Sequence, residues 1–137
     1  GLSRAQGYGV NFSEYKDWLI DKSVVIVQIE HIDAVENFNE ILSVEGVDGF
    51  IVGPYDLSAS MGIPGDFEHK DFIEIMKEID DLSKKLNSLQ GIHIIEPNPE
   101  QLSVYIAQGY KFIAYSLDIR MIDTSCRTGI SEIKLES

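Results

Sequence analysis

Apolar positions recur along the chain at two different spacings, and the two spacings alternate. Four short runs are continuously apolar and rich in β-branched residues, which is typical of strands buried on both faces of a parallel sheet. These predicted strands are residues 23–30, 49–53, 92–95 and 111–117. Elsewhere apolar residues return every three or four positions, as on one face of an amphipathic helix. The predicted helices are residues 11–21, 33–43, 70–87 and 99–108, with a last one beginning at residue 118.

Several boundary signals agree with this division. Asn98 followed by Pro99 is a strong helix start, and Gly109 is a typical residue just beyond a helix end. Asp33 with a glutamate three residues later has the capping-box pattern. Residues 54–68 contain several Gly and Pro residues and are predicted to be a loop.

The order of elements predicts an α/β fold with parallel strand pairing and right-handed crossovers. We expect a single domain over residues 1–137, made of about four βα units. Two architectures fit this order, an open doubly wound sheet and part of a (β/α)8 barrel. A complete barrel needs roughly 250 residues, so this chain could form only about half of one.

Charge and composition narrow the function classes. The formal net charge is -12 at pH 7, which argues against nucleic acid or an anionic membrane as the main partner. No apolar run approaches the roughly 20 residues of a membrane span. Cys126 is the single cysteine, which excludes an internal disulfide and predicts a reducing, cytoplasmic location.

Two carboxylates follow neighbouring predicted strands. Glu30 ends the first strand and Asp56 comes three residues after the second, so both fall at the carboxyl edge where α/β proteins place their sites. Adjacent strands lie about 4.8 Å apart, and paired carboxylates suit Mg²⁺ or Mn²⁺. Gln28 faces the same side of the strand as Glu30. The alternative interpretation makes Glu30 a rim acid, Asp56 a cap before Ser58, and Gln28 a partner of a neighbouring strand.

A tight turn separates the second strand from Asp56. Gly53 and Pro54 favour such a turn, after which the N–H groups of Tyr55, Asp56 and Leu57 could face the site. Exposed amides of this kind bind carboxylate or phosphate. The alternative is an Asx-type turn in which Asp56 satisfies its own loop.

Other polar residues carry a weaker signal. Glu96 follows the third strand, Ser116 lies near the end of the fourth, and both are expected to line the pocket. His31 should face away from the site, and His69 lies in a predicted loop. His93 lies within a strand, and such a histidine is more often a hydrogen-bonded core residue.

The sequence around the two acids resembles a known family. Residues 27–37 (VQIEHIDAVEN) and 40–62 (EILSVEGVDGFIVGPYDLSASMG) are similar to the signature of the HpcH/HpaI aldolase/citrate lyase family. The likeness continues through residues 91–93 and 109–114 to Asp118 and covers nearly the whole chain. It implies the C-terminal half of a TIM-type (β/α)8 barrel. It also implies a metal-dependent (class II) aldolase that cleaves a 2-keto-3-deoxy sugar acid, or a related 4-hydroxy-2-oxo acid, to pyruvate and an aldehyde.

The resemblance also assigns roles to residues. The family's two metal-binding acids fall on Glu30 and Asp56, and its pyruvate-contacting glutamine falls on Gln28. The amides that take the pyruvate carboxylate fall on Tyr55 and Asp56. Residues 114–118 read AYSLD where many relatives have VGSD or VGVD, so the pocket wall near Ser116 differs from theirs.

The family's catalytic histidine, its acidic partner and an arginine lie on strands that the resemblance places before Gly1. We therefore expect no certain catalytic residue in this chain and little or no aldolase activity from residues 1–137 alone. The full-length protein is expected to be a homo-oligomer. Two other functions remain open: a non-catalytic α/β module that binds a small anion, and an acyl-CoA lyase of the citrate lyase type.

Overall fold

A four-stranded parallel sheet forms the centre of the chain. The computed structural model describes residues 2–133. The strands are β1 (Ile26–Ile29), β2 (Gly49–Val52), β3 (Leu89–Ile94) and β4 (Phe112–Tyr115). They lie in the order β1-β2-β3-β4, and each pairs in parallel with the next. The predicted α/β class and parallel pairing are therefore confirmed.

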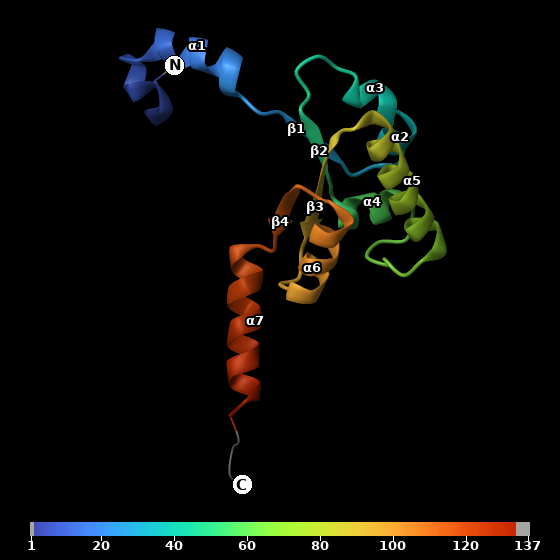
Figure 1. Cartoon of the computed structure of the whole chain (residues 1–137). Coiled ribbons are helices and arrows are strands. Elements are labelled where there is room, and N and C mark those ends of the chain that lie inside the picture. Colours follow the sequence, from blue (N-terminus) through green and yellow to red (C-terminus); the bar gives the residue numbers. More distant parts are fainter. Residues whose placement is uncertain (1, 134–137) are drawn as a thin grey trace.

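A helix follows each strand, as predicted. The helical segments are η1 (Arg4–Gly9, a 3-10 helix), α1 (Phe12–Lys22), α2 (Ile32–Glu36), α3 (Phe38–Leu42), α4 (Pro54–Ser60), α5 (Lys70–Leu86), α6 (Pro99–Gln108) and α7 (Asp118–Ser131). Figure 1 shows α2, α3, α4 and α5 gathered on one side of the sheet, whereas α1 and α7 extend away from it. No described helix is long and apolar enough to cross a membrane.

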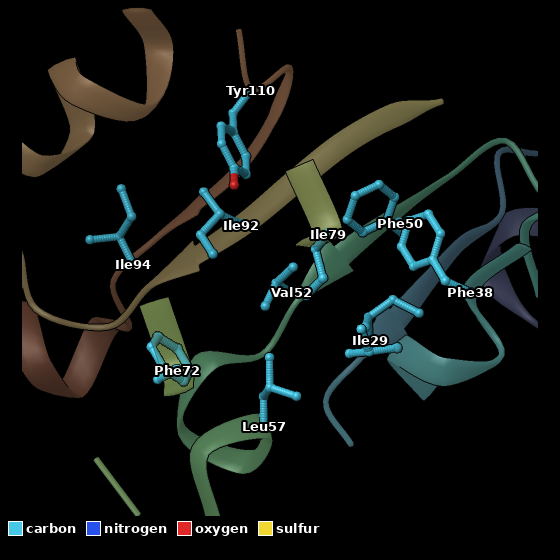
Figure 2. Close-up of a cluster of buried hydrophobic side chains, with 11 residues drawn as sticks. Ile29, Phe38, Phe50, Val52, Leu57, Phe72, Ile79, Ile92, Ile94 and Tyr110 are labelled. Carbon is cyan, nitrogen blue, oxygen red and sulfur yellow. The ribbon is translucent and has the colours of Figure 1, made fainter. Parts of the chain in front are cut away.

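The hydrophobic core lies on the helix-covered face of the sheet. It is a single cluster that combines alternate strand residues with helix residues. Figure 2 shows Ile29, Val52 and Ile92 of the strands near Leu57 and Ile79 of the helices, and all five are at most 1% exposed. Since successive strand residues point to opposite faces, residues 28, 30, 51, 53, 91 and 93 belong to the other face.

The segment predicted as one helix over residues 33–43 is two short helices. The break falls at Asn37, whose backbone (φ -98°, ψ 16°) leaves the helical region. The Asn37 side chain donates to the Asp33 carbonyl at 2.7 Å, a local bond that competes with the helical ladder. The predicted capping box is also wrong, because the N-cap is His31, whose Nδ1 accepts from the Asp33 N–H at 3.2 Å.

Two further boundaries differ from the sequence prediction. Residues 54–60 form helix α4 rather than a loop, because Pro54 occupies the first helical turn, where its missing N–H costs nothing. Strand β3 begins at Leu89, three residues before the predicted start at residue 92. The Asn98 and Gly109 signals are confirmed, since Asn98 Oδ1 accepts from the Gln101 N–H at 3.0 Å and Gly109 has a φ of 98°.

Candidate active site

Gln28 and Glu30 meet at the carboxyl end of β1. The Gln28 amide Nε2 donates to Glu30 Oε2 at 2.7 Å, and both residues are exposed on the face opposite the core. The hydrogen-bond partner of the Gln28 side chain is therefore Glu30, and the alternative of a partner on a neighbouring strand is wrong. This bond fixes one carboxylate oxygen and leaves the remaining lone pairs of Glu30 available to a ligand.

Gly53 lies directly against this pair. The Gly53 N–H donates to the Ile29 carbonyl at 3.0 Å, which extends the β1–β2 ladder by one residue. A Cβ at position 53 would lie 3.0 Å from Gln28 Nε2, 3.2 Å from Glu30 Cβ and 3.4 Å from Glu30 Oε2. Glycine thus leaves room for the side chains of Gln28 and Glu30.

Asp56 follows in the first turn of α4. The helix N-cap is Gly53, so Asp56 does not cap it, and its side chain is exposed. The Leu57 N–H already donates to the Gly53 carbonyl at 2.9 Å, which removes it from the predicted set of free amides. The Tyr55 and Asp56 N–H groups belong to the first helical turn, whose donors have no acceptor within the helix. The hydroxyl of Ser58 donates to the Tyr55 carbonyl at 2.8 Å.

The chemistry of these donors fits a hard divalent cation. Mg²⁺ and Mn²⁺ are commonly held by one or two carboxylates, with water and substrate oxygens completing the coordination. Glu30 and Asp56 provide two carboxylates at the ends of paired strands, and neither caps a helix. Within residues 2–133 no group of three or more His, Cys, Asp or Glu residues could hold a metal by itself. The set therefore suits an ion that shares its coordination with a substrate.

Ser116 is a strained residue at the end of β4. Its φ is 62°, in the left-handed region, at a cost of roughly 1–2 kcal/mol for an L-residue. It is 9% exposed, and its hydroxyl has no hydrogen-bond partner among the described residues, which costs about 1–3 kcal/mol. Strain and an unpaired buried hydroxyl at a strand end are features that cluster at binding sites.

His93 belongs to the same face of the sheet as Glu30. Ile92 and Ile94 on either side of it are in the core, so strand alternation turns His93 to the opposite face. The register pairs Val52 with Ile92, and therefore Gly53 lies level with His93. A local sequence pattern does not show this alignment, because strand register links positions 40 residues apart.

An ion-pair cluster occupies the ends of β3 and β4. Arg120 donates to Glu96 and to Asp123, each at 2.6 Å, and Arg127 donates to Asp123 at 2.8 Å. The hydrogen bond to Glu96 is the largest cause that raises the pKa of Arg120. Glu96, expected to line the pocket, thus has a structural partner, and the charge of Arg120 is neutralised locally.

A cavity of about 630 Å³ opens between α5 and α6. Of the predicted site residues, its lining includes Pro54, Tyr55 and Glu96 and does not include Gln28, Glu30 or Asp56. Its lining includes Asp80 and Tyr110, whose hydroxyl donates to Asp80 Oδ1 at 2.9 Å. Gln90 also donates to Asp80.

The pKa of Tyr110 is raised by burial and then by this bond to Asp80, and burial also raises the pKa of Tyr105. We regard the cavity as a helix-layer groove, because its buried polar groups Asp80 and Tyr110 already bind each other.

Comparison with known proteins decides the family. The pattern that defines the HpcH/HpaI aldolase/citrate lyase family matches residues 5–123. The chain belongs to this family. The HpcH/HpaI membership confirms the resemblance in the sequence, and it supports a lyase of the aldolase type.

Two curated relatives of the chain are named as aldolases. The chain is 37% identical over 127 residues to a hydroxypyruvate/pyruvate aldolase of Sagittula stellata, covering 91% of this chain and 48% of the relative. It is 28% identical over 137 residues to a 2-keto-3-deoxy-L-rhamnonate aldolase of Klebsiella pneumoniae, covering 100% of this chain and 50% of the relative. The chain thus spans about half the length of the curated relatives it matches.

Solved HpcH/HpaI structures show the same fold. A family member from Burkholderia cenocepacia superposes with a TM-score of 0.81 at 30% identity, over 96% of this chain and 50% of that one. An HpcH/HpaI aldolase from Desulfitobacterium hafniense superposes with a TM-score of 0.80 at 29% identity, over 93% of this chain and 49% of that one. The four βα units are therefore about half of this barrel-type fold.

Proposed function

We propose that the protein containing this chain is a divalent-metal-dependent aldolase that cleaves a 4-hydroxy-2-oxo acid, such as a 2-keto-3-deoxy sugar acid, to pyruvate and an aldehyde. The observation that carries the proposal is the Gln28–Glu30 hydrogen bond packed against Gly53. This arrangement holds the Glu30 carboxylate in place at the end of β1. Asp56 lies after the neighbouring strand β2, beyond the Gly53-Pro54 turn. Membership in the family supports the reaction type.

Each residue has a distinct part in this proposal. Glu30 and Asp56 would hold Mg²⁺ or Mn²⁺, and such an ion supplies Lewis-acid polarisation of the keto-acid oxygens. Gln28 orients Glu30 and donates to the keto acid with its second amide hydrogen. The Tyr55 and Asp56 N–H groups would donate to the pyruvate carboxylate beside the Gly53-Pro54 turn.

None of the residues named above is assigned as the general acid or base that proton transfer needs. Because the chain spans about half of its curated relatives, we expect turnover only where these four βα units are joined to the rest of a barrel. Residues 1–137 alone should bind metal weakly and show little or no cleavage.

Calorimetry with Mn²⁺, followed by pyruvate in the presence of Mn²⁺, tests the metal pair. Glu30→Gln and Asp56→Asn should each weaken Mn²⁺ binding at least about tenfold, since even residues that only support a ligand change affinity by 10–100-fold. Pyruvate binding should be lost in parallel. Glu45→Gln, a matched loss of charge at an exposed turn before β2, should change neither.

Two results contradict the proposal. Unchanged Mn²⁺ and pyruvate binding in both site variants would favour a small-anion module in which these acids are structural. Metal binding without Mn²⁺-dependent exchange of the pyruvate methyl protons in the whole protein would exclude the aldolase reaction.

A further inference from the structure

A polar row crosses the sheet on the face opposite the core. The register pairs Ile29 with Val52, Val52 with Ile92, and His93 with Ala114. The residues that follow Ile29, Val52 and Ile92 along the chain are Glu30, Gly53 and His93. These three residues therefore form a single row, which ends at Ala114. Glu30 and His93 are two strand spacings apart, about 10 Å between backbones.

The middle position of this row carries no side chain. This position is Gly53, and the nearest atoms to a Cβ built there belong to Gln28 and Glu30. The row thus has a carboxylate on one side of Gly53 and an imidazole on the other, and we call the space over Gly53 the gap. A gap of this width accommodates a small molecule that reaches from one side to the other.

His93 has no structural partner that accounts for it. The other two histidines each cap a helix, His31 through the Asp33 N–H and His69 through the Asp71 N–H. No side-chain hydrogen bond of His93 is found within residues 2–133, and the residue is half-buried. It is therefore not the hydrogen-bonded core histidine that the sequence suggested.

Ser116 supplies the second observation. Its N–H donates to the Ile94 carbonyl at 2.6 Å, so it continues the β3–β4 ladder two residues beyond Ala114. It is 9% exposed, and its hydroxyl is one of the two buried side-chain atoms without a partner among the described residues. The unpartnered hydroxyl of Ser116, two residues beyond the His93–Ala114 pair, and the imidazole of His93 provide two hydrogen-bonding groups on the β3–β4 side of the gap.

We propose that His93 and Ser116 form the subsite for the aldehyde part of the substrate and select a hydroxyl group on it. The inference rests on the proposed function, because it takes the Glu30 side of the row as the pyruvate end. A substrate bound at Glu30 and Asp56 would extend over Gly53 toward β3 and β4. Its far end would meet His93 and Ser116.

The local charges favour a neutral hydroxyl over a second carboxylate at that end. The residues that follow the four strands include the acids Glu30, Asp56, Glu96 and Asp118. The cation among them, Arg120, is paired with Glu96 and Asp123 at 2.6 Å each. An anionic aldehyde would meet this acidic edge, where the guanidinium of Arg120 is already paired.

The test compares two isosteric aldehydes in the whole protein with Mn²⁺ and pyruvate. Glycolaldehyde carries a hydroxyl where propionaldehyde carries a methyl group. The measured quantity is the ratio of kcat/KM for aldol addition to the two aldehydes. A site built to bind a hydroxyl should prefer glycolaldehyde, and His93→Leu and Ser116→Ala should each lower the ratio about tenfold.

Two further variants separate hydrogen bonding from packing. His93→Gln keeps a hydrogen-bonding group and should retain most of the selectivity. His69→Asn removes a histidine at a helix cap while keeping a capping side chain, and it should leave the ratio unchanged.

The outcomes distinguish this inference from the proposed function. Mn²⁺-dependent exchange of the pyruvate methyl protons reports the Glu30 side alone. Intact exchange with a ratio within twofold of wild type in His93→Leu and Ser116→Ala would overturn the subsite and leave the aldolase proposal standing. Absent exchange in the wild-type protein would overturn both. If His93→Leu does not fold, the ratio in Ser116→Ala decides.

Discussion

Gly53→Ala adds one methyl group at the point where the site and the sheet meet. The backbone of Gly53 (φ -99°, ψ 90°) is open to alanine, so the change acts through contact and not through backbone strain. The new Cβ would lie 3.0 Å from Gln28 Nε2 and 3.2 Å from Glu30 Cβ. Both side chains would have to move by a few tenths of an ångström.

Two opposing energies set the effect on stability. Overpacking a buried position costs about 1–3 kcal/mol, while replacing glycine restricts the unfolded chain and returns about 0.4–1 kcal/mol. The net loss should be about 1 kcal/mol. The Gln28–Glu30 bond, at 2.7 Å and to a charged acceptor, is worth about 1.5–3 kcal/mol if it breaks. Mn²⁺ affinity should therefore fall about tenfold, which corresponds to roughly 1.4 kcal/mol.

Calorimetry with Mn²⁺ and urea denaturation measure the two effects on the same protein. Gly129→Ala is the matched control, because Gly129 is in α7 and a Cβ there meets nothing within 4 Å. That variant should gain up to about 1 kcal/mol of stability from helix propensity and bind Mn²⁺ as wild type does. A folded Gly53→Ala protein with Mn²⁺ affinity within twofold of wild type would refute the role of Gly53.

The remaining predictions concern the core, one buried hydroxyl network and one strained residue. Phe38 is 1% exposed and packs edge-on against Phe50 with ring centroids 4.9 Å apart, so Phe38→Ala should cost about 3–5 kcal/mol in urea denaturation. Burial and the bond to Asp80 raise the pKa of Tyr110 above 10.0, so the folded state holds this proton more tightly than the unfolded chain. The contribution of the Tyr110 proton to the free energy of unfolding is complete below pH 10. Above pH 10 it declines by at most about 1.4 kcal/mol per pH unit. Tyr110→Phe should remove that decline, read from denaturation between pH 7 and 11, and cost about 1–2 kcal/mol at pH 7. Ser116→Gly relieves a positive φ and removes an unpaired hydroxyl, so thermal unfolding should show a gain of about 1 kcal/mol together with weaker glycolaldehyde selectivity.

Sequence periodicity predicted most of the fold because the signals are local. Strands β1, β2 and β4 lie within the predicted runs, whereas β3 (Leu89–Ile94) overlaps the predicted residues 92–95 only in part. Helix α5 spans Lys70–Leu86 where residues 70–87 were predicted. Asn98 and Gly109 bound α6 because a capping side chain and a left-handed glycine act on their own backbone neighbours.

The errors arose where two local signals compete. Asp33 has the right spacing for a capping box, yet His31 caps α2 because β1 ends early enough for its Nδ1 to reach the Asp33 N–H. Asn37 favours its own local bond over a continuous helix. Pro54 is compatible with both a turn and a first helical turn, and the helix prevails here.

The candidate site was predictable along each strand but not across strands. That Gln28 and Glu30 share a side follows from their spacing of two, and the structure joins them with a hydrogen bond. That His93 shares their row depends on register, which is set by pairing between residues far apart in sequence. The same dependence hides the unpaired hydroxyl of Ser116, because burial at a strand end is a property of the assembled sheet.

Glycines on the face opposite the core have two distinct functions. A Cβ at Gly49 would lie 2.6 Å from the Leu89 carbonyl oxygen, and one at Gly91 would lie 2.8 Å from the carbonyl oxygens of Phe50 and Phe112. Those contacts are with backbone, which cannot move without separating the strands, so these two glycines are required by the sheet. The three atoms nearest to a Cβ at Gly53 belong to the side chains of Gln28 and Glu30, which can move at small cost to the fold. Glycine at position 53 is therefore explained by the space that the carboxylate site needs, whereas glycine at the other two positions is explained by strand packing alone.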